Sequence, residues 1–357
     1  MSAEGTPVSN TAQLHNPIRP EWLATRDEAA IEPALPIVDA HHHLYERQGT
    51  RYLLEEFLAD LGSGHNIRAT VHVQARSMLR SDGPEHLKPV GETEFINGVA
   101  AMSASGNYGA TRVCAGIVGF ANLRLGDAVR PVLEAHVSAA GGLVTDGGRL
   151  CGIRQAVSWD ADPFFMNPAY AISENMLDSR EFRAGFAHLG ALGLSFDAWL
   201  FFHQIPRLTA LARDFPETSI VLDHCGGILG IGAYAGRQQE VFLRWKTALV
   251  ELAACPNVMV KLGGLGMRMC GLSLEGGERA PSSIDLARAW RPWIDTCIET
   301  FGPARCMFES NFPVDKGSYS YGVGWNAMKR LCAGASAAEK AALFSDSATR
   351  FYRLPPR

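Results

Sequence analysis

Residues 36–44 read PIVDAHHHL, and this stretch decides the fold. A short apolar run, Ile37 and Val38, leads into Asp39 and then into three consecutive histidines. A short apolar run of this kind is typical of a buried β-strand, and the polar residues that follow would lie at its carboxyl end. The stretch therefore predicts a strand whose last residues are potential ligands for a metal ion or a substrate.

The three histidines are expected to face in two directions. Successive side chains of a β-strand point to opposite sides, and residues two apart share a side. His41 and His43 should therefore converge on one point, whereas His42 should face away and serve a structural purpose. The rest of the chain must then supply the other walls of a site around His41 and His43.

From residue 37 onward, short apolar runs alternate with longer amphipathic segments. Strands are predicted at residues 37–38, 68–74, 113–120, 150–157, 195–202, 219–223, 258–262 and 306–309. Amphipathic helices are predicted at residues 92–102, 127–139, 182–192, 205–214, 237–254 and 283–300. Strands separated by helices pair in parallel through right-handed crossovers, and eight such units close most naturally into a (β/α)8 barrel.

The predicted organisation is an N-terminal arm, residues 1–36, followed by a distorted (β/α)8 TIM barrel, residues 37–357. An open doubly wound sheet is the alternative. It is disfavoured because a histidine cluster follows the first strand, where a dinucleotide-binding fold has a Gly-x-Gly-x-x-Gly turn. The glycine-rich segment after the seventh strand, from Gly263 to Ser283, is interpreted as a long loop at the active face.

Composition and charge exclude several classes of function. A formal net charge of -4 and a pI near 6.3 give no reason to expect nucleic acid or an anionic membrane as a partner. No apolar run approaches the roughly 18 residues of a membrane span, and the polar N-terminus lacks the pattern of a signal peptide. A cytoplasmic location is therefore expected. The eight scattered cysteines, without a Cys-x-x-Cys pair, are interpreted as reduced core residues.

Further histidines follow the fifth and sixth predicted strands. His203 lies at the end of the fifth, and His224 at the end of the sixth. Functional groups of a TIM barrel gather at the carboxyl ends of its strands, so His41, His43, His203 and His224 are expected to form a ring on one face. Neutral imidazole is the commonest protein ligand for zinc, and such a ring would hold a divalent metal such as Zn or Mn and an activated water.

The remaining histidines are interpreted structurally. His72 should pack within the barrel. Five others, which fall in arm, loop or helix contexts, are expected to be surface or capping residues: His15, His65, His86, His136 and His188.

Polar residues at other strand ends are candidates for substrate binding. Arg154 and Lys261 can both present positive charge to the barrel mouth, and the planar fork of arginine suits a carboxylate. A structural ion pair with Glu309 or Asp223 is the alternative for both cations. Three further residues complete the candidates: Gln74 and Gln155 as hydrogen-bonding groups, and Trp159 as a wall of the pocket.

An ordered series of motifs resembles the amidohydrolase superfamily, and more narrowly its amidohydrolase-2 branch of lactonase-type hydrolases. The series consists of Asp39-x-His41-x-His43, Val73-Gln74-Ala75, Glu92-Thr93, Gly152-Ile153-Arg154-Gln155, His203-Gln204, Asp223-His224-x-Gly226, Lys261-Leu262-Gly263-Gly264-Leu265 and Ser310-Asn311-Phe312-Pro313. Pro20-Glu21-Trp22-Leu23 also looks like the arm of these proteins. The resemblance spans about Pro20 to Asp315 and implies the same distorted barrel.

The resemblance implies roles for individual positions. His41 and His43 match the first ligand pair, and His203 and His224 match the histidines of strands five and six. Asn311 falls where most members carry an aspartate that binds metal and accepts the proton of the attacking water. This is the main departure, because a neutral amide cannot act as a general base.

Three consequences of this departure stay open at this point. A metal on the histidines could generate hydroxide unaided, with Asn311 orienting it. Alternatively, Glu309 or Asp315 could replace the missing carboxylate, although Glu309 could instead be a buried partner of Lys261 or Arg154. Finally, the site could work without a metal, as some lactonases of this branch do.

The expected function is that of a hydrolase that opens a lactone or related cyclic ester by attack of an activated water on the carbonyl. The expected partner is a small, carboxylate-bearing substrate, and a homo-oligomer is possible. Two alternatives remain: a non-oxidative decarboxylase or isomerase on the same barrel, and a binding protein without catalysis.

Overall fold

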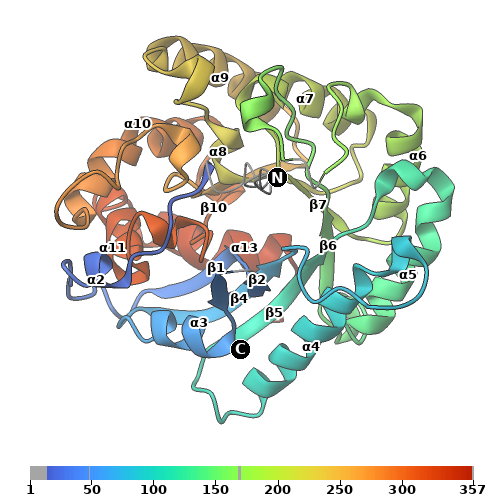
Figure 1. Ribbon diagram of the computed structural model, residues 1–357, viewed down its shortest axis with the longest axis horizontal. Coiled ribbons are helices and arrows are strands. Elements are labelled where there is room, and N and C mark those ends of the chain that lie inside the picture. The colour runs from blue at the N-terminus through green and yellow to red at the C-terminus, as the bar shows by residue number, and fades with distance from the viewer. Residues whose placement is uncertain (1–13, 48, 168–169, 356–357) are drawn as a thin grey trace, which may run out of the picture.

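The computed structural model describes residues 14–47, 49–167 and 170–355. Eight strands form one parallel sheet in the order β1-β4-β5-β6-β7-β8-β9-β10, which confirms the predicted barrel (Figure 1). The strands are β1 (Pro36–His42), β4 (Asn66–Val73), β5 (Arg112–Gly119), β6 (Leu150–Arg154), β7 (Ser195–Ala198), β8 (Ile220–Leu222), β9 (Val258–Leu262) and β10 (Cys306–Phe308). A hairpin that the sequence did not predict, β2 (Tyr45–Arg47) with β3 (Thr50–Tyr52), follows β1.

Helices surround the strands (Figure 1). They are α2 (Pro20–Leu23), α3 (Leu54–Leu61), α4 (Val90–Ala104), α5 (Arg130–Ala139), α6 (Arg180–Ala191), α7 (Ile205–Asp214), α8 (His224–Gly227), α9 (Gln238–Ala253), α10 (Ser283–Phe301), α11 (Tyr321–Leu331), α12 (Ala337–Ala341) and α13 (Ser347–Phe351). The six predicted amphipathic segments correspond to α4, α5, α6, α7, α9 and α10. No helix among the described residues is long and apolar enough to cross a bilayer.

The ring closes just beyond β10 through the aspartate of the opening stretch. Asp39 Oδ1 accepts a hydrogen bond from the Ser310 backbone N–H at 2.9 Å, and Asp39 Oδ2 accepts one from the Tyr321 hydroxyl at 2.9 Å. Backbone bonds from Asn311 N to His41 O and from His43 N to Phe312 O complete the closure. Burial raises the pKa of Asp39 to about 6, although these donors oppose the rise. Asp39 thus joins the first and last strands.

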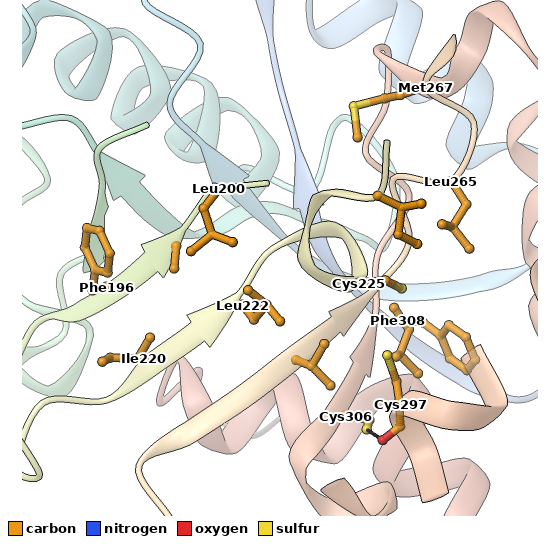
Figure 2. Packing of buried hydrophobic residues seen from close by; sticks show 14 of the residues in the cluster. Phe196, Leu200, Ile220, Leu222, Cys225, Leu265, Met267, Cys297, Cys306 and Phe308 are labelled. Carbon is orange, nitrogen blue, oxygen red and sulfur yellow. Dashed lines mark hydrogen bonds between the residues drawn. The ribbon is translucent and has the colours of Figure 1, made fainter. Parts of the chain in front are cut away.

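Two apolar layers hold the barrel together. Inside, small residues such as Val71 and Val221 meet Tyr352, which follows α13. Outside, residues such as Phe196 of β7 and Phe308 of β10 pack in a larger core against the surrounding helices (Figure 2). All eight cysteines are buried and free, as predicted, and Cys306 Sγ donates to the Cys297 carbonyl (Figure 2).

A β-bulge near the end of β1 decides which histidines face inward. Asp39 pairs with Thr70 and His42 pairs with His72, so three steps along β1 match two steps along β4. Val38 and Ala40 belong to the inner layer, and strict alternation would therefore place His42 inside as well. Because of the bulge, His42 instead stacks on Phe57 of α3, with ring centroids 4.2 Å apart. His41 and His43 consequently face the barrel interior.

The described part of the N-terminal arm runs from α2 at the rim towards the middle of the barrel (Figure 1). It is hydrogen-bonded to the long loop between β9 and α10: Arg19 donates to the Glu275 carbonyl at 2.8 Å, and Trp22 Nε1 to the Gly277 carbonyl at 2.9 Å. The loop after the seventh strand and the arm therefore form one layer over the carboxyl ends of the strands.

Gly185 offers a test of the packing between helices. A Cβ on Gly185 of α6 would lie 2.0 Å from the Leu123 carbonyl oxygen, so no side chain fits there. We expect Gly185→Ala to lower the free energy of unfolding by about 1–3 kcal/mol, measured by urea denaturation. Gly98, exposed on α4 with open space around it, is the control. Gly98→Ala should raise stability by about 0.5–1 kcal/mol, and equal losses at both positions would contradict the packing.

Candidate active site

A pocket lies at the carboxyl ends of the strands and contains about 870 Å³ of space, its open mouth included. Its floor contains four residues that the sequence predicted: His43, Arg154, His224 and Asn311. Its upper walls carry mainly aromatic and apolar residues, among them Tyr45, Phe165, Trp199, Phe201, Met267 and Met269. Polar groups at the base of an apolar pocket are the usual arrangement of a small-molecule site.

His41 and His43 converge as the sequence predicts. His43 Nδ1 donates to the Val73 carbonyl at 2.7 Å, which leaves its Nε2 as an acceptor 3.2 Å from His41 Nε2. Burial lowers the pKa of both histidines well below the ordinary value; the charge of Arg154 also lowers both, and that of Lys261 lowers the pKa of His41. Both imidazoles are therefore neutral at pH 7, the form that binds a metal ion or accepts a proton.

His224 and Glu309 form a short, buried polar contact in the site. Glu309 Oε1 lies 2.6 Å from His224 Nδ1, and Glu309 Oε2 lies 3.0 Å from His41 Nδ1. Both the Glu309 and the His41 side chains are fully buried. The carboxylate thus lies between two histidines that come from different strands. Among the described residues it forms no ion pair with Lys261 or Arg154, the alternative that the sequence left open, although its charge acts on Lys261.

Lys261 lies beneath the pocket, not in its wall. Its ammonium group is fully buried, 2.6 Å from Asp197 Oδ2, 3.0 Å from Asp223 Oδ1 and 3.0 Å from His41 Nδ1. Burial alone would lower the pKa of Lys261, but the charges of Asp197, Asp223 and Glu309 outweigh it and raise this pKa. The structural ion pair, the alternative reading of Lys261, is therefore what its contacts show.

Arg154 reaches the pocket from the end of β6. Its Nη2 donates to the Gln74 carbonyl at 2.6 Å, and its Nη1 lies 3.3 Å from His41 Nε2 and 3.8 Å from Asp223 Oδ2. The guanidinium therefore lines the pocket, and one of its nitrogens also lies near the buried carboxylate of Asp223. Its Nε has no hydrogen-bond partner among the described residues.

Asn311 lines the pocket, and Asp315 lies behind it. Asn311 Nδ2 donates to Asp315 Oδ1 at 2.8 Å, while the other oxygen of Asp315 accepts from Gly266 N and the Tyr319 hydroxyl. Asp315 therefore does not reach the pocket as a substitute carboxylate. Its contact orients the Asn311 amide, whose Oδ1 has no partner among the described residues.

His203 does not join the other three histidines. The fifth strand of the barrel, β7, ends at Ala198 rather than at residue 202, and Trp199 occupies the place beside His224, with ring centroids 4.9 Å apart. The chain then turns into a short 3-10 helix, η6 (Phe202–Gln204), which carries His203 outward to Asp160, with His203 Nε2 2.9 Å from Asp160 Oδ2. The expected four-histidine ring is corrected to three histidines and Glu309.

Two of the three remaining candidates lie outside the pocket. Gln74 lines it, and neither polar atom of its side chain has a partner among the described residues. Gln155 instead accepts from Leu123 N at 2.8 Å and so holds the loop after β5. Trp159 is half-buried, bonded through its backbone N–H to Gln204, and is not among the pocket residues.

Several pocket residues were missed in the sequence. His15 of the arm, which was expected at the surface, lines the pocket together with Leu14. Arg47 and Trp199 line it as well. The sequence predicts that Trp199 lies within a strand, and the arm carries no periodic pattern. No sequence signal therefore places Trp199 or the arm residues Leu14 and His15 in the pocket.

The sequence model of the amidohydrolase family, amidohydrolase-2 type, matches residues 38–354. The chain belongs to the amidohydrolase family. The match covers every strand of the barrel from Val38 onward, together with all the pocket residues except those of the arm. Membership of this family makes the chain an enzyme of the amidohydrolase type.

This amidohydrolase is similar over most of its length to a protein named as a lactonase and to two solved structures. An L-fucono-1,5-lactonase of Burkholderia multivorans is 28% identical over 332 residues, which cover 89% of this chain and 96% of that protein. An amidohydrolase structure from Burkholderia multivorans with bound zinc is 27% identical, with a TM-score of 0.67 over 89% of this chain and 99% of that one. The fold is shared with a Pseudomonas putida structure that is named as a putative 2-pyrone-4,6-dicarboxylic acid hydrolase. That structure is 17% identical, with a TM-score of 0.59 over 90% of this chain and 99% of that one.

The amidohydrolase has a candidate metal site in His41, His224 and Glu309, whose ligand atoms all lie within 4.8 Å of one another. The chemistry of the site fits a cation. Two buried cations, Lys261 and Arg154, face three buried carboxylates, and Glu309 Oε2 has no hydrogen-bond donor among the described residues. The 3.2 Å between the Nε2 atoms of His41 and His43 is also close to the separation of two nitrogen ligands on one tetrahedral zinc, roughly 3.3 Å.

Proposed function

We propose that this protein is a lactonase, which adds water to the carbonyl of a small cyclic ester. The observation that carries the proposal is the His224–Glu309 pair at the floor of an apolar pocket, in a chain similar over most of its length to a lactonase. An acyl-transfer site needs a group that takes a proton from water and a group that stabilises the developing oxyanion. The pocket floor offers both.

His224 is proposed as the group that takes the proton. An ionised Glu309 only accepts hydrogen bonds, so the 2.6 Å contact places a proton on His224 Nδ1 and leaves Nε2 as a base. This arrangement compensates for Asn311, which cannot take a proton itself. The free Asn311 Oδ1 would accept a hydrogen bond from the attacking water and orient it.

Arg154 is proposed to hold negative charge at the pocket floor. Its guanidinium would bind a carboxylate on the substrate or the carboxylate that ring opening creates, and Arg47 adds a second positive charge to the pocket lining. Gln74, with an unpaired amide, would donate to and accept from the substrate. Tyr45, Trp199 and Phe201 limit access of water to the floor.

In the metal-loaded site, a divalent ion, for which we propose zinc, would be held by His41, His224 and Glu309, with His43 beside them. His224 would then be a ligand, so its role as the base applies to the metal-free site. When bound, such an ion polarises a carbonyl and lowers the pKa of water. His203 is not part of this proposed set, because it is bonded to Asp160 instead.

The test is a panel of cyclic and open substrates: L-fucono-1,5-lactone, 2-pyrone-4,6-dicarboxylate, phenyl acetate and an acetamide. We expect one or both lactones to be hydrolysed with kcat/KM of about 10⁴ M⁻¹s⁻¹ or more, measured by acid release above a blank without enzyme. The product must gain one water by mass spectrometry. Elemental analysis of protein purified without chelator would show about one zinc per chain.

Other outcomes would assign the alternatives. Release of carbon dioxide would indicate a decarboxylase, and an unchanged product mass would indicate an isomerase. Tight binding of a lactone without turnover would indicate a binding protein. Any of these three results would replace the lactonase proposal.

A further inference from the structure

The N-terminal arm contributes a side chain to the pocket that no strand of the barrel supplies. His15 and Leu14 line the same pocket as His224 and Asn311. The Nδ1 atom of His15 is buried and has no hydrogen-bond partner among the described residues. A buried polar group without a partner is costly, so this atom at the pocket wall calls for a partner, which a bound ligand or a water supplies.

The position of His15 is fixed by the contacts of its neighbour Asn16. Its neighbour Asn16 donates from Nδ2 to the Ser318 hydroxyl at 2.8 Å. A Cβ on Gly317 would lie 2.2 Å from the Asn16 carbonyl oxygen, so only a glycine lets the arm approach this closely. Gly317 and Ser318 directly follow the segment in which Asp315 orients Asn311. The arm is therefore packed against the segment that follows the pocket residue Asn311.

The imidazole of His15 is a neutral hydrogen-bonding group. Burial, together with the nearby charges of Arg47 and His224, lowers its pKa to about 4. A neutral imidazole has one donor and one acceptor and so matches a hydroxyl or a ring oxygen. Gln74 and Asn311 likewise present unpaired neutral polar atoms to this pocket.

We propose that His15 contacts the substrate and that the arm is part of the active site. In this proposal, which rests on the lactonase function proposed above, His15 Nδ1 forms a hydrogen bond with a hydroxyl or ring oxygen of the lactone. His15 takes no part in moving the proton, because His224 and Glu309 do so. Its contribution is to substrate binding.

The kinetic test compares three variants on the lactone of the panel that is hydrolysed fastest. His15→Ala should raise KM about 3- to 10-fold, as expected for one neutral hydrogen bond, with little change in kcat. His15→Asn, whose amide lies where Nδ1 was, should restore much of the wild-type KM. His188→Ala is the matched control, because His188 on α6 pairs with Asp127 at the surface. An unchanged KM in His15→Ala would overturn the proposal.

A second readout does not depend on turnover. The imidazole nitrogen signals of ¹⁵N-labelled protein are recorded with and without an excess of sodium D-gluconate, an open hydroxy acid of the class that ring opening yields. The signal missing from His15→Ala identifies His15, and gluconate should shift it while the His188 signal stays in place. If the wild type hydrolyses no lactone, the lactonase proposal fails. The spectrum then still tests whether His15 contacts a hydroxy acid bound in the pocket. A His15 signal that gluconate does not move would overturn the contact.

Discussion

Replacing Glu309 with glutamine should lower kcat/KM for lactone hydrolysis by about 10²–10⁴-fold, the usual contribution of a positioned base. The carboxylate lies 2.6 Å from His224 Nδ1 and holds the proton there. A glutamine amide can donate to Nδ1 instead, which would move the imidazole proton to Nε2 and remove the lone pair that faces the pocket. The measurement is steady-state kinetics at pH 7, with circular dichroism to verify the fold.

The same pair provides a stricter test through non-additivity. His224→Ala should cost about as much as Glu309→Gln, and the double variant little more than either, because the two residues act as a unit. Losses that multiply would contradict the pairing. Glu28→Gln, which alters a carboxylate bonded to Ser283 far from the pocket, is the control and should retain full activity.

His203→Ala separates the structure from the sequence motif. The motif predicts a loss of activity as large as that of His224→Ala. The contact between His203 and Asp160 predicts that most activity is retained.

Replacing Lys261 with methionine should destabilise the protein by about 3–5 kcal/mol, as is usual when one partner of a buried ion pair is removed. Methionine has nearly the same length but no charge, so Asp197 would be left buried without a counter-ion and Asp223 would keep only the more distant Arg154. Thermal and urea unfolding measure the loss. Lys340→Met is the control. Lys340 pairs with Glu32 near the surface, and such a pair contributes at most about 1 kcal/mol.

The pH dependence of this loss tests its cause. The pKa of Asp197 is already raised to about 6, because burial and the charge of Asp223 together outweigh the opposing effect of Lys261. Without Lys261, Asp197 binds a proton more readily in the folded state than in the unfolded chain. Folding therefore takes up a proton, and a lower pH stabilises the folded state of the variant. The stability gap between Lys261→Met and wild type should therefore shrink from pH 8 to pH 5. A gap that is constant with pH would indicate lost packing instead of an unpaired charge.

Much of this protein could be predicted from its sequence because the relevant signals are local. Apolar runs at regular spacing identified all eight strands, and polar residues just after those runs identified His41, His43, Arg154, His224 and Asn311, all of which lie in or directly beneath the pocket. The absence of charge bias, of cysteine motifs and of long apolar runs was equally visible. These features follow from the composition of single segments and need no knowledge of distant contacts.

The tertiary structure decided the rest, since each remaining feature depends on a contact between distant segments. The bulge in β1 reverses the alternation of PIVDAHHHL, so pairing with β4 is what points His41 and His43 inward. β7 ends at Ala198, which sends His203 outward. Glu309 meets His224 across 85 residues, and His15 reaches the pocket only because Asn16 is seated on Gly317. The sequence by itself determined which residues carry the chemistry at each strand end, but barrel closure decided which of them meet, because pairing register and strand length are set by neighbouring strands.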